Sequence, residues 1–160
     1  MRTSPVSMKA FLWSKFWTGL VPLMILAECL TVVSNHFLGV APFLNVVTAT
    51  AVFFMTFALV GLAAGMGARY PRFNAESMTQ VAGSYGGISF MVAAVLFTLV
   101  EIVLVSWPSS VYLWYDYRSA PLPSRLWLPM ALAFGTAIAV SMVVFWTSMK
   151  QGVRALEDMG

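Results

Sequence analysis

The chain has 160 residues, of which 60% are hydrophobic and 9% are charged, whereas a soluble domain is about 45–50% apolar and about 25% charged. This composition excludes a water-soluble globule, because one small core cannot hide so much apolar surface, and it predicts a polytopic membrane protein. One cysteine and one histidine exclude a disulfide framework and a histidine cluster, so no metal site is predicted. The net charge of +3 comes from scattered Lys and Arg residues, which argues against a nucleic-acid partner.

Four hydrophobic segments are long enough to cross a bilayer, since a spanning helix needs about 20 largely apolar residues. No internal repeat and no flexible linker divides the chain. We therefore predict an all-α, polytopic integral membrane protein with one transmembrane helical domain over residues 1–160. It is a bundle of four transmembrane helices, which span approximately residues 17–35, 42–68, 86–107 and 126–148.

Two short helices are expected outside the four spans. Residues 8–17 are dense in Phe, Leu and Trp and carry two lysines, which predicts a short interfacial N-terminal helix that leads into the first span. Between spans 2 and 3, Pro71 ends the preceding helix, Asn74 is a good N-cap and Gly83 can stop a helix. This pattern predicts a short cytosolic helix over residues 74–82.

The distribution of Lys and Arg predicts the orientation, because cytoplasmic loops carry an excess of these residues. Seven of the nine lie at the end that holds both termini and the loop between spans 2 and 3, whereas the other end has Arg118 and Arg125. We therefore place both termini in the cytoplasm, in a multi-pass protein of the inner (plasma) membrane. The seven are Arg2, Lys9, Lys15, Arg69, Arg72, Lys150 and Arg154.

The outer loop between spans 3 and 4 is expected to be long and irregular, because several prolines limit regular structure after Trp107. Aromatic residues also gather there, as amphipathic rings do at the level of the lipid headgroups. The prolines are Pro108, Pro121, Pro123 and Pro129, and the aromatic residues are Trp107, Tyr112, Trp114, Tyr115, Tyr117 and Trp127.

Two carboxylates, Glu28 and Glu101, lie within the predicted spans, where a buried charge costs a few kcal/mol unless it is paired or hydrated. Glu28, Thr31 and Asn35 share one helix face, and Thr98 lies one turn from Glu101. We expect both faces to point into the bundle. Two interpretations stay open: the polar side chains form a path or relay for ions or protons, or they hold helices together by hydrogen bonds without a role in transport.

Small residues spaced by four predict close contacts between helices, because they let helix backbones approach each other in lipid. Gly61 and Gly65 form such a pair in the second span, and Ala131, Gly135 and Ala139 form a series in the fourth. We expect these faces to pack within one bundle, while contact with another subunit stays open.

A pattern of residues spread over most of the chain carries a family resemblance. Those of the N-terminal half are Ser4, Pro5, Val6, Ser7, Leu12, Lys15, Phe16, Trp17, Pro22, Glu28, Ser34 and Asn35. Those that follow are Gly65, Gly67, Ala68, Tyr70, Pro71, Arg72, Phe73, Ala75, Glu76, Gly83, Ser84, Tyr85, Gly86, Gly87, Gly152, Arg154, Ala155 and Leu156. With this pattern, most of the chain resembles bacterial ABC-2-type transporter permeases, in particular a branch of ABC exporter permeases.

The resemblance implies contact with an ABC ATPase through cytosolic elements of the permease. The N-terminal segment looks like a coupling helix, and the helix expected between spans 2 and 3 should face the same subunit. Such permeases are normally longer, so the chain looks like a C-terminal portion, a truncated reading frame or one half of a split permease. The residues assigned to coupling are Ser4, Pro5, Ser7, Phe11, Leu12, Lys15, Asn74, Glu76, Met78 and Val81.

We therefore expect a membrane-spanning permease component of an ABC exporter that couples to a separate ATPase subunit, because the sequence has no Walker motif. The alternative is a small four-helix structural or assembly subunit of a larger membrane complex. An enzyme is not expected, since no nucleophile with a base, no paired catalytic carboxylates and no metal set are present. No cofactor is expected, and the expected partners are the ATPase, other permease helices or a second permease copy, and the lipid bilayer.

Overall fold

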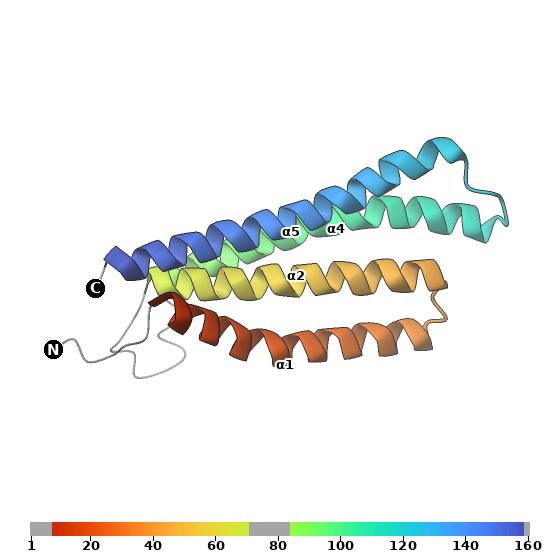
Figure 1. Ribbon diagram of the computed structural model, residues 1–160. Coiled ribbons are helices and arrows are strands. Elements are labelled where there is room, and N and C mark those ends of the chain that lie inside the picture. The colour runs from red at the N-terminus through yellow and green to blue at the C-terminus, as the bar shows by residue number, and fades with distance from the viewer. Residues whose placement is uncertain (1–7, 71–83, 159–160) are drawn as a thin grey trace.

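The computed structural model describes residues 8–70 and 84–158, which form four helices (Figure 1). The helices are α1 (Met8–Phe37), α2 (Pro42–Arg69), α4 (Tyr85–Tyr117) and α5 (Ser124–Asp158). All four are long and apolar enough to cross a membrane. The prediction of an all-α bundle of four transmembrane helices is therefore confirmed.

Successive helices run in opposite directions, so the bundle has two distinct ends (Figure 1). The terminal end holds the start of α1, the end of α2, the start of α4 and the end of α5. The loop end holds the connections at residues 38–41 and 118–123. Within the described ranges, Lys9, Arg69 and Arg154 belong to the terminal end, while Arg118 and Arg125 belong to the loop end.

The helix α2 lies at the centre of the arrangement, because it packs against each of the other three helices. The helix α5 also packs against α4 and, over a shorter stretch, against α1. In the part of the chain that the structure describes, α1 and α4 do not contact each other. Towards the loop end, α5 leans away from α2 (Figure 1). The bundle is thus closely packed at one end and more open at the other.

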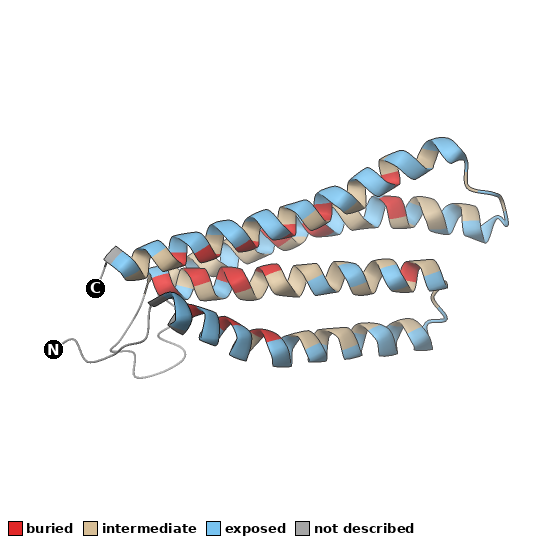
Figure 2. Ribbon diagram, viewed as in Figure 1, coloured by how far each residue is buried: buried red, intermediate tan, exposed pale blue. Residues whose placement is uncertain are grey.

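The apolar core lies near the terminal end, where α1, α2 and α5 meet (Figure 2). Phe16 is at its centre and is fully buried, with ring centroids of Phe57 and Phe145 both 5.3 Å from its own. Along most of the loop-end half of α1, large apolar side chains are exposed, as expected for a surface that faces lipid. The core residues are Leu12, Phe16, Leu20, Ala68, Phe145 and Met149.

The N-terminal interfacial helix is not a separate element, and this part of the prediction is wrong. The helix α1 runs without a break from Met8 to Phe37. Leu12, Phe16 and Leu20 recur every four residues and are all buried in the core, so they fix this stretch to the bundle and keep it in line with the span. The cytosolic helix expected over residues 74–82 lies outside the described residues.

The expected irregular loop after Trp107 is also wrong, because α4 continues through Pro108 to Tyr117. Pro108 is almost fully buried against the bundle. Ser109 Oγ donates a hydrogen bond to the Val105 carbonyl oxygen at 2.7 Å. Pro108 has no N–H to donate to the Leu104 carbonyl, and the Ser109 hydroxyl adds a donor at the next carbonyl, that of Val105. Membrane helices tolerate a proline that is packed against neighbouring helices, as Pro108 is. The actual connection is only residues 118–123.

Candidate functional site

The carboxyl group of Glu101 is the most unusual polar feature of the bundle. Glu101 lies midway along α4 and is 4% exposed, which makes it the one buried charged residue in the described part of the chain. Ser141 of α5, itself buried, donates a hydrogen bond from Oγ to Glu101 Oε1 over 2.8 Å. This bond joins α4 to α5 in the middle of the bundle, and a hydrogen bond between buried groups is stronger than the same bond in water.

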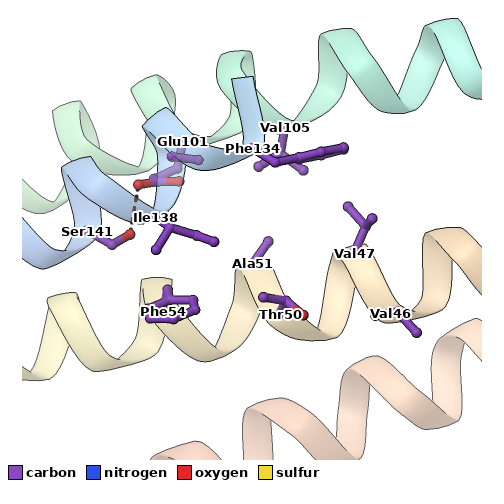
Figure 3. A pocket seen from close by; sticks show the side chains of 11 residues that line it. Val46, Val47, Thr50, Ala51, Phe54, Glu101, Val105, Phe134, Ile138 and Ser141 are labelled. Atoms are coloured by element: carbon purple, nitrogen blue, oxygen red, sulfur yellow. Dashed lines mark hydrogen bonds between the residues drawn. The ribbon is translucent and has the colours of Figure 1, made fainter. Parts of the chain in front are cut away.

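A cavity of about 140 Å³ lies beside this carboxyl group, between α2, α4 and α5 (Figure 3). Figure 3 shows the Glu101–Ser141 hydrogen bond on one side of the cavity, with Val47 and Ala51 of α2 pointing towards it from the opposite side. The lining is largely apolar and contains no Lys, Arg or His. The lining residues are Val46, Val47, Thr50, Ala51, Phe54, Glu101, Val105, Phe134, Ala137, Ile138 and Ser141.

Glu101 also lines a second cavity, of about 250 Å³, between α2 and α4. Ala51 and Val105 border both cavities, so the two spaces lie next to each other around the same carboxyl group. Thr48 and Ser106 add hydroxyl groups to the second cavity. The carboxyl group therefore borders two neighbouring spaces walled mainly by apolar side chains, and the second is a groove that reaches the outer surface at Ile102 and Ser106.

A polar network at the loop end connects α1 to α2. Asn35 Nδ2 donates hydrogen bonds to Asn45 Oδ1 at 2.9 Å and to Thr48 Oγ1 at 2.7 Å. The Thr48 hydroxyl in turn donates to the Leu44 carbonyl oxygen at 2.8 Å. Since Thr48 borders the second cavity, this network places polar groups between the loop end and Glu101.

Glu28 and Thr31, which were also predicted to be intramembrane polar residues, do not form one site with Glu101. Glu28 lies on α1, which does not contact α4 within the described residues, and it borders neither of the two cavities at Glu101. Its Oε1 atom is buried and has no hydrogen-bond partner in the described part of the chain. Thr31 donates to the Ala27 carbonyl oxygen of its own helix, and Thr98 is half-buried one turn from Glu101. A single path through Glu28 and Glu101 is thus not what the structure shows.

The small residues of α2 lie where α2 and α5 approach most closely. A Cβ atom built on Gly65 would overlap the backbone carbonyl of Ser148, and one built on Gly152 would come within 2.9 Å of Gly65 Cα. A Cβ atom built on Gly61 would overlap the ring of Phe145. These positions need glycine because any side chain would push the two helices apart.

The small residues of α5 were expected to pack against other helices of the bundle, but in the structure they are exposed. Ala131, Gly135 and Ala139 are exposed, and a Cβ atom built on Gly135 would meet nothing within 4 Å. The side of α5 that faces the bundle carries Ala137 and Ser141 instead, followed by larger apolar residues. The series therefore lies on the outer surface of the bundle, and the prediction that it packs inside was wrong.

Leu12, one of the residues predicted to contact an ATPase, is buried in the core of the bundle. Leu12 is 2% exposed, and one of its methyl carbons, Cδ2, would lie 3.3 Å from a Cβ atom built on Gly152. A side chain enclosed in this way cannot anchor a partner subunit on the surface. Lys15 is exposed on the neighbouring face of α1.

The remaining coupling predictions have no described side chain. Phe11 lies within α1, but its side chain is outside the described part of the structure. The others lie outside the described residues altogether; they are Ser4, Pro5, Ser7, Asn74, Glu76, Met78 and Val81.

Sequence reasoning missed Ser141 and the packing role of Gly152. The signal for Ser141 was its position four residues after Ala137, a spacing that places both on one face. The same predicted span also contains Thr136, Thr147 and Ser148, so a hydroxyl group alone did not single it out. Gly152 lies beyond the predicted end of the fourth span, so its packing role was not considered. Both residues acquire their importance from contacts with other helices.

The comparisons with known proteins identify a family over the whole chain. A family model with the description "Putative ATP-binding cassette" matches residues 1–160. The match therefore includes all four helices and the residues that surround both cavities at Glu101. No curated protein and no solved structure matches the chain.

Proposed function

The chain belongs to the family described as putative ATP-binding cassette, and on this premise we propose that it is the permease component of an ABC exporter. The observation that carries the proposal is the presence of four membrane-spanning helices in a member of this family. A component that crosses the bilayer several times is suited to form a translocation path. The sequence contains no GxxxxGK[ST] phosphate-binding motif, so we assign ATP hydrolysis to a partner ATPase.

The contacts of α1 suggest how an ATPase would act on the bundle. A peripheral subunit changes a membrane bundle only through contacts that differ between its own states. The start of α1 is held against α5 by the packing of Leu12 at Gly152 and by an exposed ion pair, in which Lys9 Nζ lies 3.4 Å from Glu157 Oε1. A push on the start of α1 would therefore reach α5 and, through Phe16, also α2.

We expect an ATPase to copurify with this chain from native membranes. An affinity-tagged chain, extracted in mild detergent, should recover a polypeptide with a Walker motif, detected by mass spectrometry and by ATP hydrolysis. Replacing Met78 and Val81 together by alanine should lower this recovery about tenfold or more, because a few apolar side chains carry most of the energy of an interface.

The matched control is Leu132→Ala, which changes an apolar side chain exposed on the outer surface of α5. Its recovery of the ATPase should equal that of the unchanged chain. If the unchanged chain brings down no ATPase from membranes of its native host, the permease proposal is wrong.

We also propose that the terminal end faces the cytoplasm. In a Cys29→Ala background, which removes the single cysteine, Ser119→Cys should react with an impermeant thiol reagent added outside intact cells. Ser77→Cys should react only after the membrane is opened. This result is expected because most Lys and Arg residues lie at the terminal end. Labelling of the variant at residue 77 but not at residue 119 in intact cells would reverse the orientation.

A second function is favoured by one observation. The outer surface of α5 carries a line of small exposed residues, Ala131, Gly135 and Ala139. Helices pack closely in lipid through such lines of small residues. A structural subunit of a larger membrane complex would use such a line to bind its neighbours. An ATPase reading frame beside the gene favours the permease, and its absence favours the structural subunit.

A further inference from the structure

We propose that the two cavities at Glu101 bind a small lipophilic amine in its cationic form, with the ammonium group on the Glu101 carboxylate. If the chain is a permease, this is the class of its substrate, and that transport role rests on the proposed function. The binding itself does not, because it is a property of the bundle that α2, α4 and α5 form.

The charge of the site favours a cationic ligand. A carboxylate at the centre of a bilayer is costly unless a positive group pairs with it. No residue that lines either cavity is basic. In the described part of the chain, Ser141 is the hydrogen-bond donor to this carboxyl and engages Oε1, which leaves Oε2 for a donor from a ligand. An ammonium group would supply both the positive charge and the missing donor.

The size and lining of the first cavity favour an apolar body of about the size of one aromatic ring. Its volume is about 140 Å³, and an apolar cavity of about 150 Å³ is known to take up benzene. Phe54 and Phe134 contribute aromatic rings to its wall, and aromatic faces attract ammonium groups. The adjoining space of about 250 Å³ shares Glu101, so it gives room for substituents on the nitrogen.

The combination of these features selects one chemical class among small apolar molecules. A neutral compound of the same shape would fill the cavity but leave the carboxylate without a counter-charge. An anion would face the carboxylate directly and be repelled. A ring-sized amine is the ligand that satisfies both the apolar wall and the acidic group, and benzylamine is its simplest representative.

The test is equilibrium dialysis of benzylamine against the purified full chain in detergent at pH 7, with empty micelles as the blank. Benzyl alcohol and benzoate are the neutral and anionic comparison ligands. We expect saturable binding of benzylamine, weaker binding of benzyl alcohol and none of benzoate. Glu101→Gln should weaken benzylamine binding about tenfold or more, because it removes a charge-assisted hydrogen bond, and should leave benzyl alcohol within about twofold.

Three further variants make the result decisive. Ser141→Ala keeps the carboxyl group, so it should retain benzylamine binding, whereas Ala51→Phe should fill the cavity and abolish binding of both ligands. The matched control is Asp116→Asn, which changes an exposed carboxyl at the loop end of α4 and should leave the binding of benzylamine and of benzyl alcohol unchanged. Size-exclusion chromatography confirms that each variant is folded.

Two results would overturn the proposal. One is equal binding of benzylamine by the unchanged chain and by folded Glu101→Gln, and the other is a preference for benzyl alcohol, which would mean that Glu101 is a neutral acid held by Ser141. Either result leaves copurification of an ATPase unaffected. Conversely, saturable binding without any ATPase would refute the permease and retain the amine site.

Discussion

Replacing Gly65 by alanine is expected to destabilise the purified protein by about 1–3 kcal/mol, the usual cost of forcing extra atoms into a closely packed interior. The reason is that the new Cβ atom would overlap the backbone carbonyl of Ser148, which cannot move without shifting the whole of α5. The loss should appear as a lower temperature of thermal unfolding in detergent, followed by the decay of the monodisperse peak in size-exclusion chromatography.

The matched control is Gly67→Ala, two residues further along the same helix. A Cβ atom at Gly67 would meet nothing within 4 Å, so this variant should be as stable as the parent, or more stable by about 0.5–1 kcal/mol because alanine favours the helix. The same stability for the two variants would mean that α2 and α5 are not in close contact at Gly65.

Replacing Glu101 by lysine is expected to have the second large effect. A lysine at the centre of a spanning helix costs about 3 kcal/mol, and here its ammonium group would enter cavities whose walls offer no other acidic side chain. The yield of monodisperse protein should therefore fall severalfold, measured by size-exclusion chromatography after expression at equal levels.

Two control variants show whether the loss of yield comes from a lysine at residue 101 in particular. One removes the carboxylate charge without adding lysine, and the other places lysine at a different position. Glu101→Gln keeps the shape and can still accept the hydrogen bond from Ser141, so its yield should match that of the parent. Asp116→Lys introduces lysine at an exposed carboxyl near the loop end of the same helix, where the change is expected to cost less than about 0.5 kcal/mol. Normal yield of Glu101→Lys would show that residue 101 has access to water.

The existence and approximate positions of the four helices could be predicted because few backbone conformations are stable in the hydrocarbon core of a bilayer. Backbone groups in the bilayer must be hydrogen-bonded within the chain, so a long apolar segment becomes a helix. The same reasoning explains the error at Pro108. Proline ends helices in water, but in α4 it is buried against neighbouring helices and flanked by a serine hydroxyl that bonds back to the backbone.

The orientation of each helix about its own axis could not be predicted with the same certainty. In a soluble bundle the apolar stripe marks the buried face, whereas here the faces towards lipid and towards the core are both apolar. Leu12 therefore looked like a surface anchor, although it is buried. The pairing of Glu101 with Ser141 depends on two such orientations in residues 40 positions apart, so the sequence indicated the carboxyl group but not its partner.

The contact between Gly65 and Gly152 gives the bundle the geometry of a lever. Along each helix, the lining of the cavity at Glu101 begins 11 residues away, at Phe54 on α2 and at Ser141 on α5, which is about 16 Å at 1.5 Å per residue. With the glycine contact as the pivot, a rotation of α5 by about 7° shifts its cavity wall by roughly 2 Å over that arm. Since such a shift is comparable to the radius of a methyl group, a small displacement at the terminal end is enough to open or close the space around the carboxyl group.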